Sequence, residues 1–165
     1  MARAVLIGLP GCGKSTLARA LAADWGCDAV DTDEVLSASV GCSAAEFLRT
    51  KGEEAFRRHE VAALDAALAS DAVVATGGGV VTSPAARDLL AEELTVWLDC
   101  EDDVLLARLG DGERPLLSVD PAGTLARLRA QREDWYRDVA TVKVDTSGGV
   151  DEALARLREA LEISE

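Results

Sequence analysis

The chain has no uninterrupted apolar run of about 18 residues, the length that a membrane-spanning helix requires, although 48% of its residues are hydrophobic. It has no C-x-x-C pair, and its four cysteines accompany a single histidine, so neither a zinc site nor a disulfide scaffold is indicated. Basic residues are few: 17 Lys and Arg against 30 Asp and Glu give a net charge of -13. This balance argues against binding a polyanion through a general electrostatic field. We therefore expect a soluble protein with no membrane and no nucleic acid as partner.

Asparagine does not occur at all, so the N-K-x-D pattern with which guanine-specific switches select their base is missing. No internal repeat or low-complexity segment is visible. A length of 165 residues suits one domain that buries roughly two-thirds of its unfolded surface, and we expect a single domain over residues 1–165 that acts as a monomer. Met1 to Arg3 lead directly into the first apolar run, which predicts no targeting segment and a cytoplasmic location.

Residues 8–16 read GLPGCGKST, a complete G-x-x-x-x-G-K-S/T signature directly after the apolar run at residues 4–7. The pattern predicts a phosphate-binding loop, because a triphosphate needs closely packed backbone N–H donors and glycine lets the chain turn tightly there. Lys14 is expected to reach the terminal phosphates and the Ser15 hydroxyl to ligate Mg²⁺. The alternative is a chance glycine-rich turn, but a helical pattern follows. The predicted nucleotide-binding residues are Gly11, Cys12, Gly13, Lys14, Ser15 and Thr16.

Short apolar runs alternate with helical patterns, which predicts an α/β fold with a five-stranded parallel sheet. Right-handed crossovers then give a three-layer α/β/α sandwich, with ligands at the carboxyl ends of the strands. Two stretches interrupt the alternation: residues 34–70 are expected to form a helical substrate-binding insertion and residues 110–123 a mobile lid. A helix from Val150 to Leu161 is expected to have a purely structural role. The predicted strands are residues 4–7, 28–30, 72–75, 94–98 and 141–144.

Arg57 lies one turn before the apolar stripe of a predicted helix. A guanidinium at the head of a buried stripe should be paired, and Glu60 is close enough in sequence to orient it. The side chain could instead extend into solvent, but Phe47 and Phe56 would wall a small pocket, which favours a functional role. The stripe consists of Val61, Leu64 and Leu68.

Arg132 repeats this irregularity within the apolar face of a later helix. Arginine presents a planar fork that matches a carboxylate or a phosphate, so two arginines directed into one pocket suggest a small anionic acceptor. The neighbouring Arg127, Arg129 and Arg137 are interpreted as solvated surface residues. The face itself consists of Leu125, Leu128, Trp135 and Val139.

Asp31 and Asp33 follow the second predicted strand, and their spacing points both carboxylates toward one site if the backbone stays extended. One carboxylate can serve Mg²⁺, directly or through water, while the other can orient and deprotonate an attacking hydroxyl. Asp33 could also cap the next helix, and these roles are compatible.

Gly77, Gly78 and Gly79 follow the third predicted strand, where many nucleotide-binding folds carry an acidic residue. Three consecutive glycines let a ligand touch bare backbone, so we interpret them as a floor for the acceptor rather than as a simple loop. Arg114, inside the predicted lid, would be carried onto the transferring phosphate when the lid closes.

Taken together, these residues resemble the shikimate kinase family over essentially the whole chain and in the expected order. The distinctive elements are Asp31-Thr32-Asp33, the run GEEAFRRHE at residues 52–60, the glycine triplet 77–79 and RPLL at residues 114–117. The resemblance implies ATP- and Mg²⁺-dependent phosphorylation of the 3-hydroxyl of shikimate, a step in aromatic amino-acid biosynthesis. Shikimate itself follows from the resemblance and not from the bottom-up argument.

The resemblance also implies a role for each matching residue. Lys14 and the loop amides hold the phosphates, and Ser15 binds Mg²⁺ with Asp31 as its partner. Asp33 contacts the acceptor hydroxyls as the candidate base. The remaining implied roles are a carboxylate clamp by Arg57 and Arg132, a pocket lining by Gly78 and Gly79, charge neutralisation by Arg114 and adenine stacking by Arg108.

The segment at residues 145–149 departs from the family, which often places an arginine and a proline there against the adenine. A kinase for another small acid such as gluconate, or a nucleoside monophosphate kinase of similar fold, is a neighbouring alternative. The two stripe-breaking arginines and the glycine triplet favour a compact carboxylate over a nucleotide as acceptor. A nucleotide-sensing switch without turnover is an alternative of another class, but acceptor-binding insertions would be superfluous in it.

Overall fold

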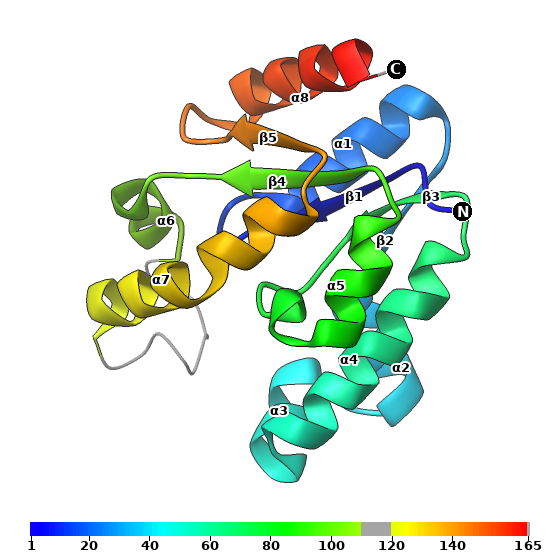
Figure 1. Ribbon diagram of the computed structural model, residues 1–165, viewed down its shortest axis with the longest axis vertical. Helices are drawn as coiled ribbons and strands as arrows, with labels where there is room; N and C mark the ends of the chain where they lie inside the picture. The colour runs from blue at the N-terminus through cyan, green and yellow to red at the C-terminus, as the bar shows by residue number, and fades with distance from the viewer. Residues whose placement is uncertain (110–119, 165) are drawn as a thin grey trace.

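The computed structural model describes residues 1–109 and 120–164 of the chain (Figure 1). Within these ranges five parallel strands form one sheet in the order β2-β3-β1-β4-β5. The predicted parallel sheet is confirmed, and no strand end differs from its prediction by more than one residue. The strands are β1 (Ala4–Ile7), β2 (Asp28–Asp31), β3 (Ala72–Ala75), β4 (Thr95–Asp99) and β5 (Val142–Asp145).

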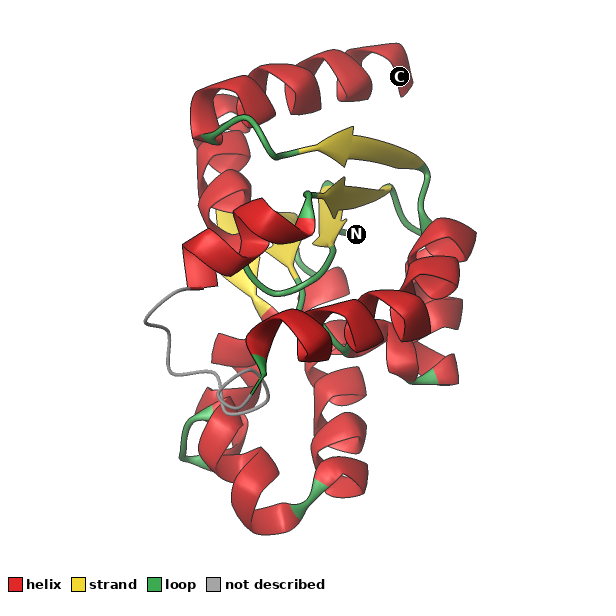
Figure 2. Cartoon of the chain, turned by 90° about the vertical axis from the view of Figure 1, so that its left-hand side faces the viewer, coloured by secondary structure: helices red, strands yellow, loops and turns green. Residues whose placement is uncertain are grey.

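Helices cover both faces of the sheet, which makes the predicted three-layer α/β/α sandwich. Helices α1 and α8 pack against each other and against β2, β3 and β5, while α5 and α7 lie side by side on the other face. The turned view shows the strands between these helical layers (Figure 2). The helices are α1 (Lys14–Trp25), α2 (Thr32–Val40), α3 (Ala44–Lys51), α4 (Glu53–Leu68), α5 (Pro84–Ala91), α6 (Asp102–Leu109), α7 (Pro121–Val139), α8 (Val150–Ser164) and the short 3-10 turn η1 (Val80–Thr82).

Burial follows the sheet order. Every residue of the central strands β1 and β3 is buried, because these strands have helices on both faces and a strand on each side. The edge strands β2 and β5 carry exposed polar residues such as Asp28 and Lys143. The β-branched and aliphatic core therefore lies in the middle of the molecule, and polar groups gather where strands end.

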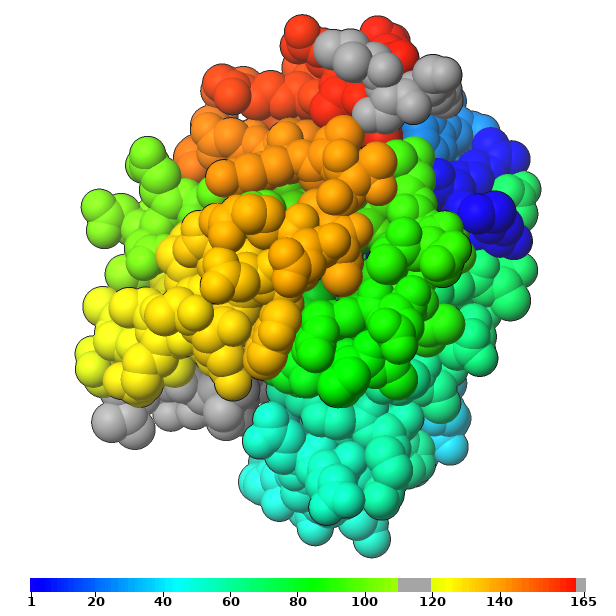
Figure 3. All heavy atoms as spheres, viewed as in Figure 1, coloured from blue at the N-terminus to red at the C-terminus, as the bar shows by residue number. Residues whose placement is uncertain are grey.

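The predicted helical insertion falls on α2, α3 and α4, which form the cyan lobe at the bottom of the space-filling view (Figure 3). These helices enclose a small core of their own, separate from the core around the sheet. Ser43 begins α3 by accepting the backbone N–H of Glu46 at 3.1 Å, as an N-cap residue does. The small core consists of Leu36, Phe47, Phe56 and Ala63.

The last residues of the predicted lid, 121–123, belong to a helix. Residues 121–123 form the first turn of α7, because Pro121 suits the start of a helix and the Asp120 carboxylate accepts the backbone N–H of Gly123 at 3.2 Å. Residues 110–119, which include Arg114, lie outside the described residues. Among the described helices, none combines the length and hydropathy needed to cross a membrane.

Candidate active site

The loop between β1 and α1 has the geometry of an anion site. Helix α1 begins at Lys14 after the cap residue Gly13, and no side chain caps its first N–H groups, which leaves these donors for a ligand. The Lys14 side chain is buried and folds back across the loop, donating to the carbonyls of Gly8 at 2.7 Å and Leu9 at 3.1 Å. An ammonium group is thus held at the base of the loop.

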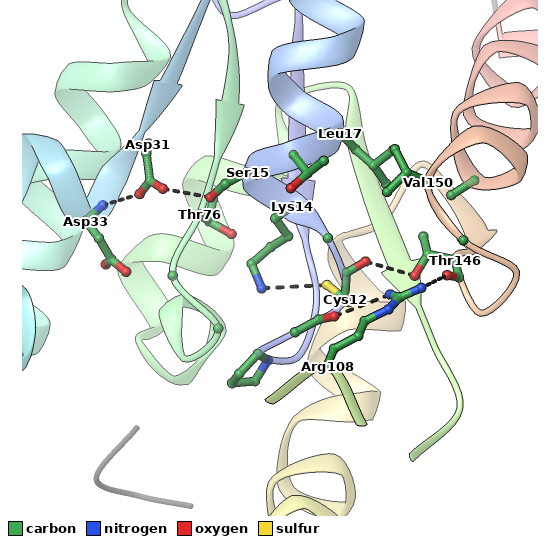
Figure 4. A pocket seen from close by; sticks show the side chains of 18 residues that line it. Cys12, Lys14, Ser15, Leu17, Asp31, Asp33, Thr76, Arg108, Thr146 and Val150 are labelled. Carbon is green, nitrogen blue, oxygen red and sulfur yellow. Dashed lines mark hydrogen bonds between the residues drawn. The ribbon is translucent and has the colours of Figure 1, made fainter. Parts of the chain in front are cut away.

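A pocket of about 450 Å³ opens over this loop at the carboxyl ends of the strands (Figure 4). It brings together every predicted nucleotide-binding residue among the described residues, and both Asp31 and Asp33. Its far wall comes from the start of α8, which contributes Val150 and Ala153, so this helix borders the pocket as well as packing on the sheet. The lining residues are Pro10 to Leu17, Asp31, Asp33, Thr76, Gly77, Gly78, Arg108, Thr146, Gly149, Val150 and Ala153.

Asp31 and Asp33 lie beside the phosphate loop. Asp31 ends β2 and caps α2, because one of its carboxylate oxygens accepts the Asp33 backbone N–H at 2.8 Å. Its other oxygen accepts the Ser15 hydroxyl at 2.8 Å (Figure 4). The proposed capping role of Asp33 is therefore wrong, as is the extended backbone, since α2 begins at Thr32. Asp33 still faces the pocket from the first turn of α2.

Two residues of the glycine triplet, Gly77 and Gly79, lie so close to charged side chains that a larger residue would displace those side chains. A Cβ atom on Gly77 would lie 2.8 Å from a Glu60 oxygen and 3.0 Å from an Asp33 oxygen. A Cβ atom on Gly79 would lie 2.6 Å from both terminal nitrogens of Arg57. Asp33, Glu60 and Arg57 lie up to 27 positions apart in the sequence. All three side chains lie next to the backbone of the glycine triplet.

Arg57, Glu60 and Arg132 form a charged group next to the pocket, although Arg57, Gly79 and Arg132 are not among the residues that line it. The expected contact is confirmed: Arg57 donates to Glu60 at 2.8 Å. Burial raises the pKa of Glu60, and the Arg57 and Arg132 guanidinium groups oppose this rise. The Nε atoms of Arg57 and Arg132 are buried without a hydrogen-bond partner. Buried donors of this kind normally have one.

Sequence reasoning missed Tyr136. Its ring is buried and stacks on Trp97 with centroids 5.9 Å apart, and its hydroxyl donates to the Gly78 carbonyl at 2.5 Å. The spacing of Tyr136, four residues after Arg132, was the available signal, since residues four apart share a helix face.

Arg108 lies at the end of the pocket formed by the segment after β5. Its guanidinium donates to the Thr146 carbonyl at 2.6 Å and to the Gly11 carbonyl at 3.4 Å. The Thr146 hydroxyl in turn donates to the carbonyl of Cys12 at 2.9 Å. These bonds fasten the segment after β5 to the phosphate loop and hold the guanidinium plane at the pocket wall.

The expectation that Arg129 is a solvated surface residue is wrong. The Arg129 guanidinium contacts Asp99 at 2.9 Å and Asp102 at 2.8 Å and donates to the Cys100 carbonyl at 2.6 Å. Arg127 and Arg137 are exposed, as expected. The difference arises because β4 and α6 present two carboxylates to the face of α7 that carries Arg129.

A phosphate loop at the first strand-to-helix junction, within a sheet of this topology and next to the group of Arg57, Glu60 and Arg132, is typical of the class of P-loop kinases that act on small molecules. The chain belongs to the shikimate kinase family, whose model matches residues 10–162.

Individual relatives agree with this membership. A shikimate kinase of Halorhodospira halophila is 44% identical over 97% of this chain and 93% of its own length. The structure of shikimate kinase from Acinetobacter baumannii in complex with shikimate superimposes with a TM-score of 0.88 at 31% identity, covering 98% of this chain and 93% of that chain. A gluconokinase from Sinorhizobium meliloti has a TM-score of 0.63 at 25% identity, covering 98% of this chain and 96% of its own. Similarity of fold thus extends to a kinase that is named for a different acceptor.

Proposed function

We propose that this chain transfers the terminal phosphoryl group of ATP to the 3-hydroxyl of shikimate, giving shikimate 3-phosphate and ADP in aromatic amino-acid biosynthesis. The observation that carries the acceptor is the pair of buried arginines beside the glycine triplet. The buried Nε–H of Arg132 has no hydrogen-bond partner, and the Nε–H of Arg57 has none either, with only an ion-pair contact of 3.6 Å to the exposed Glu53. A guanidinium fork matches a carboxylate. Family membership supports shikimate as the molecule that supplies this carboxylate.

The acceptor occupies the space between the arginines and the phosphate loop. Arg57 and Arg132 clamp its carboxylate, and Gly78 and Gly79 form its floor because no side chain separates the ligand from their backbone. Asp33 receives the hydroxyl groups at the other end. This arrangement spans from a cationic clamp to the pocket that contains Lys14, so the hydroxyl-bearing side of the ring, with its 3-hydroxyl, faces the donor.

Phosphoryl transfer then needs positioning and charge neutralisation more than covalent chemistry. Asp33 accepts the proton of the attacking hydroxyl as the oxygen–phosphorus bond forms. Lys14 exchanges its contacts with the Gly8 and Leu9 carbonyls for the phosphate oxygens and stabilises the developing negative charge. Arg114 adds a second cation in this proposal, and its placement lies outside the described residues.

Mg²⁺ fits the donor set next to Lys14. Ser15 and Asp31 supply a hydroxyl and a carboxylate 2.8 Å apart, and hard oxygen ligands suit this ion, which usually takes few ligands from the protein and completes its shell with water and phosphates. When bound, Mg²⁺ would neutralise phosphate charge, with Ser15 as direct ligand and Asp31 holding it directly or through water.

The base of ATP lies at the other end of the pocket in this proposal. Arg108 offers its guanidinium plane to the adenine, held by Thr146 and Gly11. Val150 is half exposed and lines the same pocket, so it supplies the apolar contact opposite. We further propose that the protein works as a cytoplasmic monomer without nucleic acid or membrane partners.

The test is a coupled ADP-release assay with ATP and Mg²⁺ that compares shikimate, gluconate, a nucleoside monophosphate and no acceptor. Of these four conditions, we expect turnover only in the one that contains shikimate. A Lys14→Met variant, which keeps the buried stem and removes the ammonium group, should have a kcat at least about 100-fold lower. Turnover only with another acceptor would overturn shikimate as substrate. Nucleotide binding without acceptor-dependent turnover would overturn the kinase and favour a nucleotide sensor.

A further inference from the structure

Tyr136 is the only tyrosine of the chain, and none of the roles above uses it. Only 1% of its surface is exposed, and its ring is fixed against Trp97 of β4. Its hydroxyl donates to the Gly78 carbonyl across 58 positions of sequence, at 2.5 Å. Burial raises the pKa of this phenol well above its usual value, so the hydroxyl stays protonated and keeps donating at neutral pH.

The bond to Gly78 determines the direction of the next N–H group. The described part of the chain has no cis peptide bond, and a planar trans peptide points its carbonyl and its N–H in opposite directions. Holding the Gly78 carbonyl toward α7 therefore turns the Gly79 N–H away from α7. Among the described residues this N–H has no acceptor, and Gly79 lies directly against the guanidinium of Arg57.

Gly78 also touches the phosphate loop. A Cβ atom on Gly78 would lie 3.0 Å from the ring of Pro10, so its backbone is enclosed between Pro10 on one side and the Tyr136 hydroxyl on the other. The position of the glycine floor relative to the donor phosphates thus depends on both contacts. Pro10 limits the space beside Gly78, and the Tyr136 hydroxyl holds the Gly78 carbonyl.

Tyr136 acts on the arginine clamp as well. It lies one turn after Arg132 on the same face of α7, and the Arg132 guanidinium interacts with its hydroxyl. One phenol therefore connects the helix that carries Arg132 with the loop that carries Gly78 and Gly79. A tyrosine that merely filled the core would need its ring and not its hydroxyl at this point.

We propose that Tyr136 is a positioning residue for the acceptor: its hydroxyl orients the Gly78–Gly79 peptide and the Arg132 turn so that the Gly79 N–H and the guanidinium face the bound acid. This role rests on the proposed function, since it requires shikimate as acceptor. It concerns acceptor binding and leaves nucleotide binding to the phosphate loop.

The experiment removes the hydroxyl alone, with Tyr136→Phe. We expect the KM for shikimate to rise about 3- to 10-fold, the value of one neutral hydrogen bond, while the KM for ATP changes by less than about twofold. Thr95→Val is the matched control, because it removes another buried hydroxyl, which donates to the Leu90 carbonyl at 2.7 Å at the opposite end of β4. It should lower stability and leave both KM values unchanged. Equal changes in both KM values, or an unchanged KM for shikimate, would overturn the role.

A second measurement uses the intact side chain and does not depend on how Tyr136→Phe folds. Biosynthetic 3-fluorotyrosine labels this single tyrosine and keeps its hydroxyl, so the one ¹⁹F resonance of the protein reports on Tyr136. We expect the resonance to shift on addition of shikimate and not on addition of ADP alone. An unmoved resonance at saturating shikimate would overturn the positioning role alone, whereas failure of the wild-type protein to bind shikimate by calorimetry would overturn the proposed function with it.

Discussion

At the scale of single residues, the site is defined by charged groups kept out of water. Arg57 and Arg132 are both largely buried, and Glu60 is only 2% exposed. Burying ions is unfavourable unless partners replace the lost water. Glu60 supplies part of this compensation, and the two Nε atoms that lack a hydrogen-bond partner leave room for a ligand to supply the rest.

Replacing Arg57 tests the clamp. Arg57→Ala should raise the KM for shikimate on the order of 30-fold or more, because it removes charge-assisted hydrogen bonds to the carboxylate, and it should leave the KM for ATP within about twofold. Arg58→Ala is the matched control on the same helix, since that side chain is 70% exposed. Steady-state kinetics with each substrate varied would measure this, and loss of folding in Arg57→Ala would show a structural role instead.

The raised pKa of Glu60 predicts a pH-dependent stability difference. A carboxyl group whose pKa is higher in the folded state than in the unfolded state binds its proton more strongly when folded, so its contribution to stability falls as pH rises from the unfolded pKa through the folded one. Glu60→Gln removes this titration. The unfolding free energy of the variant relative to wild type should therefore increase with pH across that window and then level off.

Urea unfolding at a series of pH values from about 4 to 8 would measure the effect. Glu54→Gln provides the comparison, because that side chain is 92% exposed, and its difference from wild type should not change in the same way. A Glu60→Gln difference that stayed constant with pH would contradict the raised pKa.

At the scale of elements, α7 is the structural support of the acceptor side. It carries Arg132 and Tyr136, and Arg129 ties its first half to β4 and α6 through Asp99, Asp102 and the Cys100 carbonyl. The guanidinium is only 21% exposed, so solvent screens these contacts less than it screens surface pairs. The position of the clamp therefore depends on contacts that sequence patterns do not reveal.

Arg129→Ala should lower the free energy of unfolding by about 1–3 kcal/mol, the range for losing partly buried charged hydrogen bonds. Arg127→Ala on the same helix should change it by less than about 0.5 kcal/mol, because the Arg127 side chain is exposed and donates to the neighbouring Thr124 hydroxyl at 3.1 Å. Chemical denaturation of both variants gives the comparison. Similar losses in the two variants would contradict a special role for Arg129.

At the scale of the whole molecule, the net charge is -13, yet basic side chains gather at one site. In the proposed function they bind two anionic ligands, the nucleotide and shikimate. Ligands that bind only the folded state stabilise it, by about 2.7 kcal/mol at 100 times Kd. For a chain of this size that corresponds to a rise in Tm of about 5–10 °C. ADP with Mg²⁺ and shikimate should each produce such a rise.

The Lys14→Met variant distinguishes stabilisation by ADP from stabilisation by shikimate. It should lose most of the rise caused by ADP and keep the rise caused by shikimate, because the ammonium group lies in the phosphate loop and not among the acceptor residues. Thermal denaturation with each ligand measures this. An undiminished response of the variant to ADP would contradict the role of Lys14.

Much of the fold and part of the site could be predicted from the sequence, because the signals are local. Strand positions, the phosphate loop and the two arginines that break apolar stripes are visible as spacing within one or two turns of chain, and the Arg57–Glu60 contact follows from helix geometry. The same local view failed for the surface position of Arg129 and for the capping role of Asp33, and it missed Tyr136, whose partners come from distant segments.

The sequence by itself determined which elements form and which residue types reach the carboxyl ends of the strands. Only the tertiary structure decided that Glu60 meets Asp33 across Gly77, that Arg57 lies against Gly79 and that the Tyr136 hydroxyl holds Gly78. The reason is the strand order β2-β3-β1-β4-β5, which brings loops far apart in the chain to one edge of the sheet. Periodicity records which face of an element is buried, whereas the sheet order determines which buried faces meet.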